Sequence, residues 1–211
     1  CSGGLDGNYA FTSYVNGTLT VTQPAPLTFR SNNVNDGFIV ESAETSNVGG
    51  TVNSTAATFS LGDDNLDRQY RGILHFNTAG LPDTAVVTSA TLKIKRQGVI
   101  GTNPFTILGA LRVDLRKPYF GTTIGLTGND FQARATKVST ALFNTIPAGG
   151  WYSAALNATG RLNLNRTGTT QFRLRFTKDD NNDNGFDYMK FYSGSAGAAN
   201  RPQLIIQYYV P

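Results

Sequence analysis

Apolar and polar residues alternate with a period of two in several short segments of the chain, and this pattern predicts β-strands. The clearest segment is QFRLRF at residues 171–176, where three apolar side chains are expected to face a core and Arg173 and Arg175 to face solvent. The segment QLIIQYYV at 203–210 is apolar on both faces, which predicts a strand inside a sheet. Further strands are expected at residues 37–41, 58–62, 71–76, 87–96, 107–115, 151–156 and 188–193.

Helical periodicity is nearly absent from the sequence. One short turn is predicted within residues 127–136, with Asn129 or Asp130 as its N-cap. Many short strands separated by Gly, Pro and Asn turns are typical of an antiparallel β-sandwich. We therefore predict an all-β fold, a jelly-roll-like sandwich over residues 30–211.

Residues 1–29 have a different pattern, which predicts an N-terminal strand extension. Asn16-Gly17 is a hairpin signal, the alternating segment 18–23 follows it, and Pro-Ala-Pro at 24–26 favours an extended linker. An isolated hairpin is at best marginally stable in water. The extension therefore needs a partner that the sandwich itself does not obviously supply.

Composition and charge narrow the function classes. The net charge is +4 with 15% charged residues and no basic cluster, so we expect no nucleic-acid binding. No apolar stretch approaches the roughly 20 residues of a membrane span. The single cysteine, Cys1, excludes an internal disulfide; it is either a lipidated cysteine of a bacterial lipoprotein or the point where a longer polypeptide was cut.

Two family resemblances follow from longer stretches of sequence. Residues 3–28, with NYAF and YVNGTLTVTQPAPLT, resemble the last strands of an MBG-type immunoglobulin-like repeat of large secreted bacterial surface proteins. Residues 33–211 resemble DNRLRE-type β-sandwich modules through the stretches RQYRGILHFNTAGLPDTAVVTSATLKIKRQG, TTQFRLRF, DDNNDNGFDYMKFYSG and NRPQLIIQYYVP. The resemblance implies a secreted, non-catalytic module, and some relatives bind polysaccharide. The literal DNRLRE string is absent, so no ligand preference carries over.

The resemblance suggests what the extension does. A repeat tail without the rest of its repeat has unpaired strand edges, which another strand can satisfy. We predict that residues 8–23 act as a donor strand between copies of the chain in a filament, with Tyr14, Leu19 and Val21 as the assembly contacts. The alternative is that the tail pairs with upstream repeats of a longer protein.

An acidic run at 179–187, DDNNDNGFD, contains the first half of a calcium-loop pattern. Its second half is missing, because Phe191 stands where that pattern has Glu. A structural calcium ion and a solvated Asx-rich turn are both compatible with the run, and the run GDDNLD at 62–67 could contribute further oxygens. The expected ligands are Asp179, Asp180, Asn182, Asn184 and Asp187.

Aromatic side chains near turns and strand ends form a second candidate site. Sugar rings stack on aromatic faces, and the candidates for glycan contact are Tyr119, Trp151, Tyr188 and Tyr192. The competing interpretation for each ring is ordinary packing. Catalysis is not expected, because the single histidine, His75, alternates within a predicted strand and has no obvious nucleophile partner.

These observations predict a non-catalytic structural or adhesive module of a secreted bacterial surface protein. The runner-up is a carbohydrate-binding module, and a third interpretation is the targeting or anchoring domain of an upstream secreted enzyme.

Overall fold

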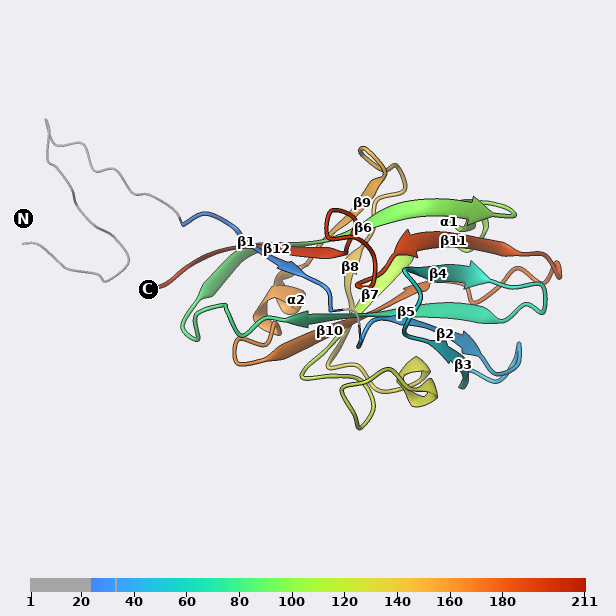
Figure 1. Ribbon diagram of the computed structural model, residues 1–211, viewed down its shortest axis with the longest axis horizontal. Coiled ribbons are helices and arrows are strands. Elements are labelled where there is room, and N and C mark those ends of the chain that lie inside the picture. The colour runs from blue at the N-terminus through green and yellow to red at the C-terminus, as the bar shows by residue number, and fades with distance from the viewer. Residues whose placement is uncertain (1–23, 33) are drawn as a thin grey trace, which may run out of the picture.

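The structure is a computed structural model that describes residues 24–32 and 34–211. Twelve strands and three short helices make up the described chain (Figure 1). The strands are β1 (Leu27–Arg30), β2 (Gly37–Glu41), β3 (Gly49–Asn53), β4 (Thr58–Asp63), β5 (Gln69–Asn77), β6 (Val86–Ile100), β7 (Leu111–Arg116), β8 (Lys137–Leu142), β9 (Trp151–Ala155), β10 (Thr169–Phe176), β11 (Asp187–Tyr192) and β12 (Gln203–Tyr209). The helices are α1 (Pro104–Ile107), the 3-10 turn η1 (Gly128–Phe131) and α2 (Ala158–Leu162).

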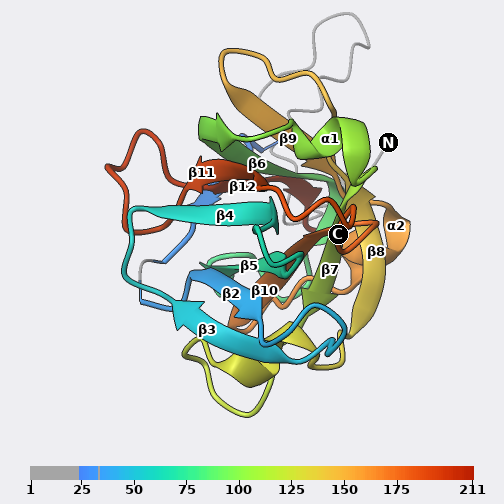
Figure 2. The same cartoon turned by 90° about the vertical axis from the view of Figure 1, so that its right-hand side faces the viewer.

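The strands form one curled antiparallel sheet, which confirms the predicted all-β, sandwich-like fold. Its order is β1-β12-β6-β11-β4-β5-β10-β7-β8, with β9 paired to β6, β2 to β5 and β3 to β2. The strand β6 is long enough to pair with β12 along its first half and with β11 near its end. This curling brings β12, β6 and β9 over β5, β10 and β7 (Figure 2).

The main core lies between these two layers, and strand alternation supplies it. Phe172, Leu174 and Phe176 of β10 are all buried on the inner face, as predicted. They meet apolar residues of β6, β9 and β12 from the other layer. Ring contacts continue across the core, where Phe59 and Phe191 stack with centroids 5.6 Å apart. Burying each such ring contributes on the order of 2–3 kcal/mol, which makes this core the main source of stability.

A second, smaller cluster covers the outer face of β2 and β5. It consists of Ile39, Ile73, Phe120 and Phe131, and the last two come from the segment between β7 and β8 that includes η1. This segment crosses beneath the sheet in Figure 1, where it is yellow-green. The prediction that Arg173 faces solvent is wrong, because its side chain lies under this segment and is 7% exposed.

Two other predictions concern local structure. The N-cap of η1 is Thr127 and not Asn129 or Asp130, because Asp130 acts from within the turn: its Oδ2 accepts the backbone N–H of Thr127 at 2.8 Å. The strand at the end of the chain, β12, lies between β1 and β6. This confirms a strand inside the sheet; Leu204 and Ile206 are buried on its core face, and the alternate residues are half-buried.

The sheet begins before residue 30, where the sandwich was expected to start. β1 begins at Leu27 and pairs with β12, and Gln207 donates to the carbonyl of Pro24 at 2.6 Å. The predicted assembly residues Tyr14, Leu19 and Val21 lie outside the described residues. Within the described residues, no helix combines the length and the apolar character that crossing a membrane requires.

Candidate functional site

Three connections meet at one end of the sandwich, and acidic residues gather there. They are the β4–β5 turn, the β6–α1 turn and the β10–β11 loop; the first and the last of these project from the same end in Figure 1. The β4–β11 register places Asp63 directly opposite Asp187. Asp187 accepts the backbone N–H of Thr102, and Asp67 accepts that of Asn184 at 3.1 Å. Carboxylates therefore hold the three connections together.

Asp63 is the most unusual of these carboxylates. It is fully buried, at 0% exposure, and neither of its oxygens has a hydrogen-bond partner within the described chain. The neighbouring Asp64 is satisfied by Arg68, whose guanidinium donates to it at 2.6 Å. Because Arg68 is bound to Asp64, no cation of the described residues compensates Asp63.

The electrostatic consequence is a perturbed carboxyl group. Burial raises the pKa of Asp63 to about 7, and the charges of Asp187, Asp180 and Asp183 push it in the same direction. The backbone N–H of Asn181 faces Asp63 and lowers its pKa, but it does not complete a hydrogen bond of normal geometry. Removal of water and repulsion between like charges both disfavour the ionised form here.

Asn181 lies beside these carboxylates in the β10–β11 loop. Its amide Nδ2 donates to Asp183 Oδ2 at 2.8 Å and to Asp187 Oδ2 at 3.2 Å. Its Oδ1 is buried and has no hydrogen-bond partner in the described chain. Three buried oxygens, two from Asp63 and one from Asn181, therefore lack a donor at this end of the fold.

The five ligands predicted from the sequence are divided by the structure. Asp187 is buried and faces Asp63, whereas Asp179, Asn182 and Asn184 are exposed. Asp180 is half-buried, and its Oδ1 accepts the backbone N–H of Asn182 at 3.0 Å. Among the residues that the structure describes, no three His, Cys, Asp or Glu side chains are grouped so that they could hold one metal ion.

Sequence reasoning missed Asp63 and Asn181 as individual residues. The run at 62–67 was expected to contribute oxygens, but the predicted strand ended at residue 62, so Asp63 was not assigned to a face of the sheet. The distinguishing signal is strand alternation: Asp63 follows the buried Leu61 at a spacing of two, so it faces the interior, and an interior Asp in a strand is rare.

The aromatic candidates are also divided. Trp151 pairs with Lys95, whose side chain faces outward, and the ammonium groups of Lys93 and Lys95 lie 5.3 and 5.8 Å from the Trp151 ring centroid. β11 lies along the other edge of β6, where Phe191 pairs with Arg96. Because Phe191 faces the core, the next residue, Tyr192, faces outward, on the same face as Trp151.

Tyr188 shares this outward side of β11 with Tyr192, and its ring centroid is 5.2 Å from that of Tyr70. Tyr119 does not belong with them. It follows β7, and its carbonyl accepts Arg116 Nε at 3.1 Å, in the segment that covers the opposite side of the molecule. The structure therefore groups three of the four rings on one face.

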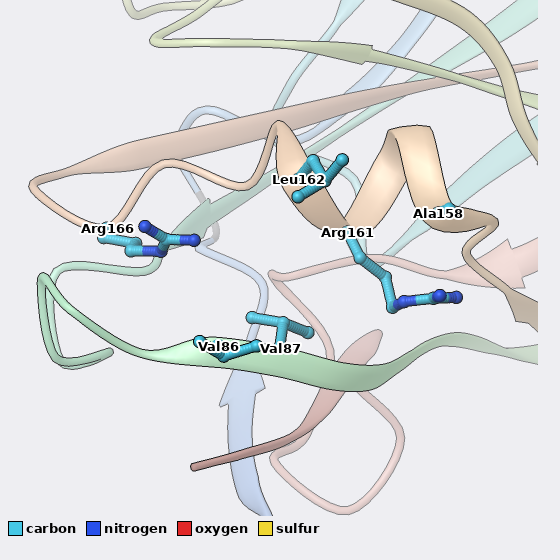
Figure 3. Close-up of a pocket in the computed structure, with 6 residues that line it drawn as sticks. All are labelled: Val86, Val87, Ala158, Arg161, Leu162 and Arg166. Atoms are coloured by element: carbon cyan, nitrogen blue, oxygen red, sulfur yellow. The ribbon is translucent and has the colours of Figure 1, made fainter. Parts of the chain in front are cut away.

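A shallow hollow lies between the start of β6 and α2 (Figure 3). Val86 and Val87 line it from β6 and Leu162 from α2, so its walls are mainly apolar. The two arginines at its rim are already engaged: Arg161 donates to the carbonyl of Leu156 at 2.9 Å, and Arg166 to that of Asp83 at 3.2 Å. Each of these bonds ties α2 or the loop after it to a neighbouring backbone segment, while Arg166 Nε is buried and makes no hydrogen bond in the described chain.

His75 is part of the sheet interior. It is 3% exposed, its Nδ1 lies 3.4 Å from Gln171 Nε2, and burial lowers its pKa. The polar neighbour on its ring is thus an amide and not a nucleophile.

The edges of the sheet differ in how they are protected. At β3, Gly49 donates its N–H to Gln132 Oε1 at 3.1 Å. At β8, the carbonyl of Thr140 accepts the N–H of Asn157 at 2.8 Å, and at β9, Ser153 exchanges two hydrogen bonds with Asn144. The outer edge of β1 receives no such hydrogen bond from residues 24–32 or 34–211.

Comparison of the sequence with protein families and with curated proteins finds no match. The two resemblances described above therefore stay predictions, and the functional argument rests on the geometry.

Proposed function

We propose that the chain is a non-catalytic structural and adhesive module of a secreted bacterial protein, which assembles with copies of itself when residues 8–23 of one copy pair with the outer edge of β1 of another. The observation that carries the proposal is the outer edge of β1, which no strand of the described chain occupies. An unpaired edge presents backbone N–H and C=O groups that can template another strand.

The position of the edge supports this function. β1 directly follows the Pro-containing linker, so the predicted donor segment precedes in sequence the strand whose outer edge receives no backbone hydrogen bond from residues 24–32 or 34–211. Thr28 and Arg30 are exposed on β1, while Leu27 and Phe29 pack toward the main core. An added strand would extend the β12 layer and place Leu19 and Val21 on one side of it.

Symmetry decides what such pairing builds. If two copies exchange their segments reciprocally, the contact is isologous and closes as a dimer. If each copy donates to the next, the contact is heterologous and produces an open filament. We propose the filament, as the tandem-repeat resemblance of residues 3–28 suggests.

We expect deletion of residues 1–23 to abolish assembly while leaving the sandwich folded. Negative-stain microscopy and light scattering of the full chain and of the deletion variant test this. A point variant refines the test: Leu19→Asp/Val21→Asp should also prevent assembly, whereas Thr20→Asp/Thr22→Asp changes the charge equally on the other side of the strand and should weaken it less. A full chain that stays monomeric at high concentration would contradict the proposal.

Carbohydrate binding is the second candidate, because Trp151, Tyr188 and Tyr192 share one outward face with Lys93 and Lys95. If this face binds polysaccharide, Trp151→Ala should weaken the affinity measured by retardation in gels about fivefold, since a stacked ring contributes on the order of 1 kcal/mol. Tyr119→Ala is the matched control, because Tyr119 lies on another part of the molecule. Equal retardation of both variants and the parent chain would exclude this face as the binding site.

A further inference from the structure

The end of the sandwich where β4 meets β11 contains two buried carboxyl groups that face no cation within the described chain. Asp63 and Asp187 are directly opposite each other in the β4–β11 register, and both are buried. Isolated buried carboxylates are costly unless a cation or several donors compensate them. Asp187 has donors, from Thr102 and from Asn181, but Asp63 has none of normal geometry among the described residues.

A proton does not resolve this arrangement. A protonated Asp63 would carry an O–H donor, and neither of its oxygens makes a hydrogen bond of normal geometry in the described chain; the one polar group that faces it, the backbone N–H of Asn181, is itself a donor. The Oδ1 of Asn181 would also stay without a donor. The group that satisfies both residues must be a donor or cation that approaches several oxygens at once.

We propose that Asp63, Asp187 and the side-chain oxygen of Asn181 form a calcium-binding site that joins the β4–β5 turn to the β10–β11 loop. All of these ligands are hard oxygens, which Ca²⁺ prefers, and its flexible coordination accommodates six to eight of them. Two carboxylates, each able to bind through one or both oxygens, and the amide supply up to five. Backbone carbonyls of the loop and water complete the shell.

The flanking residues fit this assignment. Asp180 and Asp183 lie close enough to raise the pKa of Asp63, and their charges would be offset by a divalent cation. Asp183 Oδ1 accepts the backbone N–H of Gly185 at 2.7 Å, which shapes the loop around Asn181. The site differs from the D-x-N-x-N-G pattern of the sequence, because Asn182 and Asn184 point to solvent at its outside.

The first test is calcium binding by the full chain after removal of metals with EDTA. Isothermal titration calorimetry with CaCl₂ should show one site, and 1 mM CaCl₂ should raise the unfolding temperature by about 5 °C or more. Asp63→Asn should weaken binding by at least about 30-fold, because it removes a ligand charge at the centre of the site. Asp83→Asn is the control: it removes one exposed charge at the turn between β5 and β6, and this variant should bind calcium with the affinity of the parent chain.

Stability without calcium gives a second, independent readout. In EDTA, Asp63→Asn should unfold at the same temperature as the parent chain or higher, because it relieves a buried unpaired carboxylate. In calcium the order should reverse. Asp187→Asn should also lose calcium binding, so the proposal does not depend on the folding of one variant.

The proposal is overturned if calcium neither binds nor raises the unfolding temperature, which would mean that water fills the site. It is also overturned if Asp63→Asn keeps the parent affinity while Asp179→Asn loses it. That result would assign calcium to the exposed loop pattern. Both outcomes are separate from the filament test, which changes residues 1–23 and none of the proposed calcium ligands.

Discussion

Replacement of Arg173 with methionine is expected to lower the free energy of unfolding by about 3–5 kcal/mol, the cost of breaking a buried ion pair by removing one partner. One terminal nitrogen of Arg173, Nη1, donates to the carbonyls of Asp130, Phe131 and Ala133 at 2.8–3.1 Å. The other, Nη2, donates to Asp114 Oδ2 at 3.1 Å. Methionine would fill much of the space but leave three carbonyls and a fully buried carboxylate without this donor.

Urea denaturation at pH 7 measures this change, and Arg175→Met is its matched control. Arg175 also contacts Asp114 at 3.1 Å, but its side chain is 24% exposed, and within the described chain it donates to no backbone carbonyl of the segment between β7 and β8. We expect the control to lose about 1 kcal/mol. If the two variants were equally stable, the packing of the segment between β7 and β8 on the sheet would not depend on Arg173.

The second large effect concerns pH and Asp36. This carboxyl connects the β1–β2 loop to two distant segments, since it accepts the backbone N–H of His75 at 2.6 Å and that of Gly194 at 3.0 Å. Burial raises the pKa of Asp36 from 3.8 to about 7, although these donors and Arg201 act against the rise. Between pH 4 and pH 7 the folded protein therefore retains a proton that the unfolded chain has released.

That proton stabilises the folded state at low pH, and its contribution is lost as pH rises toward 7. The full effect is about 4 kcal/mol, from roughly three pKa units at 1.4 kcal/mol each. Asp36→Asn cannot titrate, so its stability should change less between pH 4.5 and pH 8. The variant itself loses one acceptor and should cost about 1–3 kcal/mol at low pH.

The measurement is the difference in unfolding free energy between the parent chain and Asp36→Asn, taken at pH 4.5 and at pH 8. We expect the advantage of the parent chain to shrink by up to about 3 kcal/mol over this range, because only about 2.5 pH units of it lie below the folded pKa. Other titrating groups cancel in the difference. An advantage that stays constant or grows with pH would show that the backbone donors outweigh burial.

Local patterns predicted the strands well because their cause is local. The alternation in residues 171–176 indicated both the strand β10 and its core face, since a strand turns successive side chains to opposite sides. The same pattern could not show that Arg173 is buried. Its cover comes from the segment between β7 and β8, which packs on the other face of the sheet and carries no matching signal within β10.

The candidate cation site shows the same limit. The acidic runs at 62–67 and 179–187 were visible in the sequence, but the two runs meet through the pairing of β4 with β11. Strand alternation places Asp63 on the inner face, but only the pairing shows that it faces Asp187, while Asp64 is bound by Arg68. The assembly residues Tyr14, Leu19 and Val21 stay a sequence prediction.

The antiparallel pairing of β1 with β12 has a mechanical consequence. Leu27 lies opposite Ile206, so the start of β1 and the end of β12 are at the same end of the sheet. Tension applied between these two points would peel the strands apart one ladder bond after another, which needs little force. Tension that entered through a strand bound along the outer edge of β1 would load its ladder bonds together, in shear. The mechanical strength of the module therefore depends on which path carries the load.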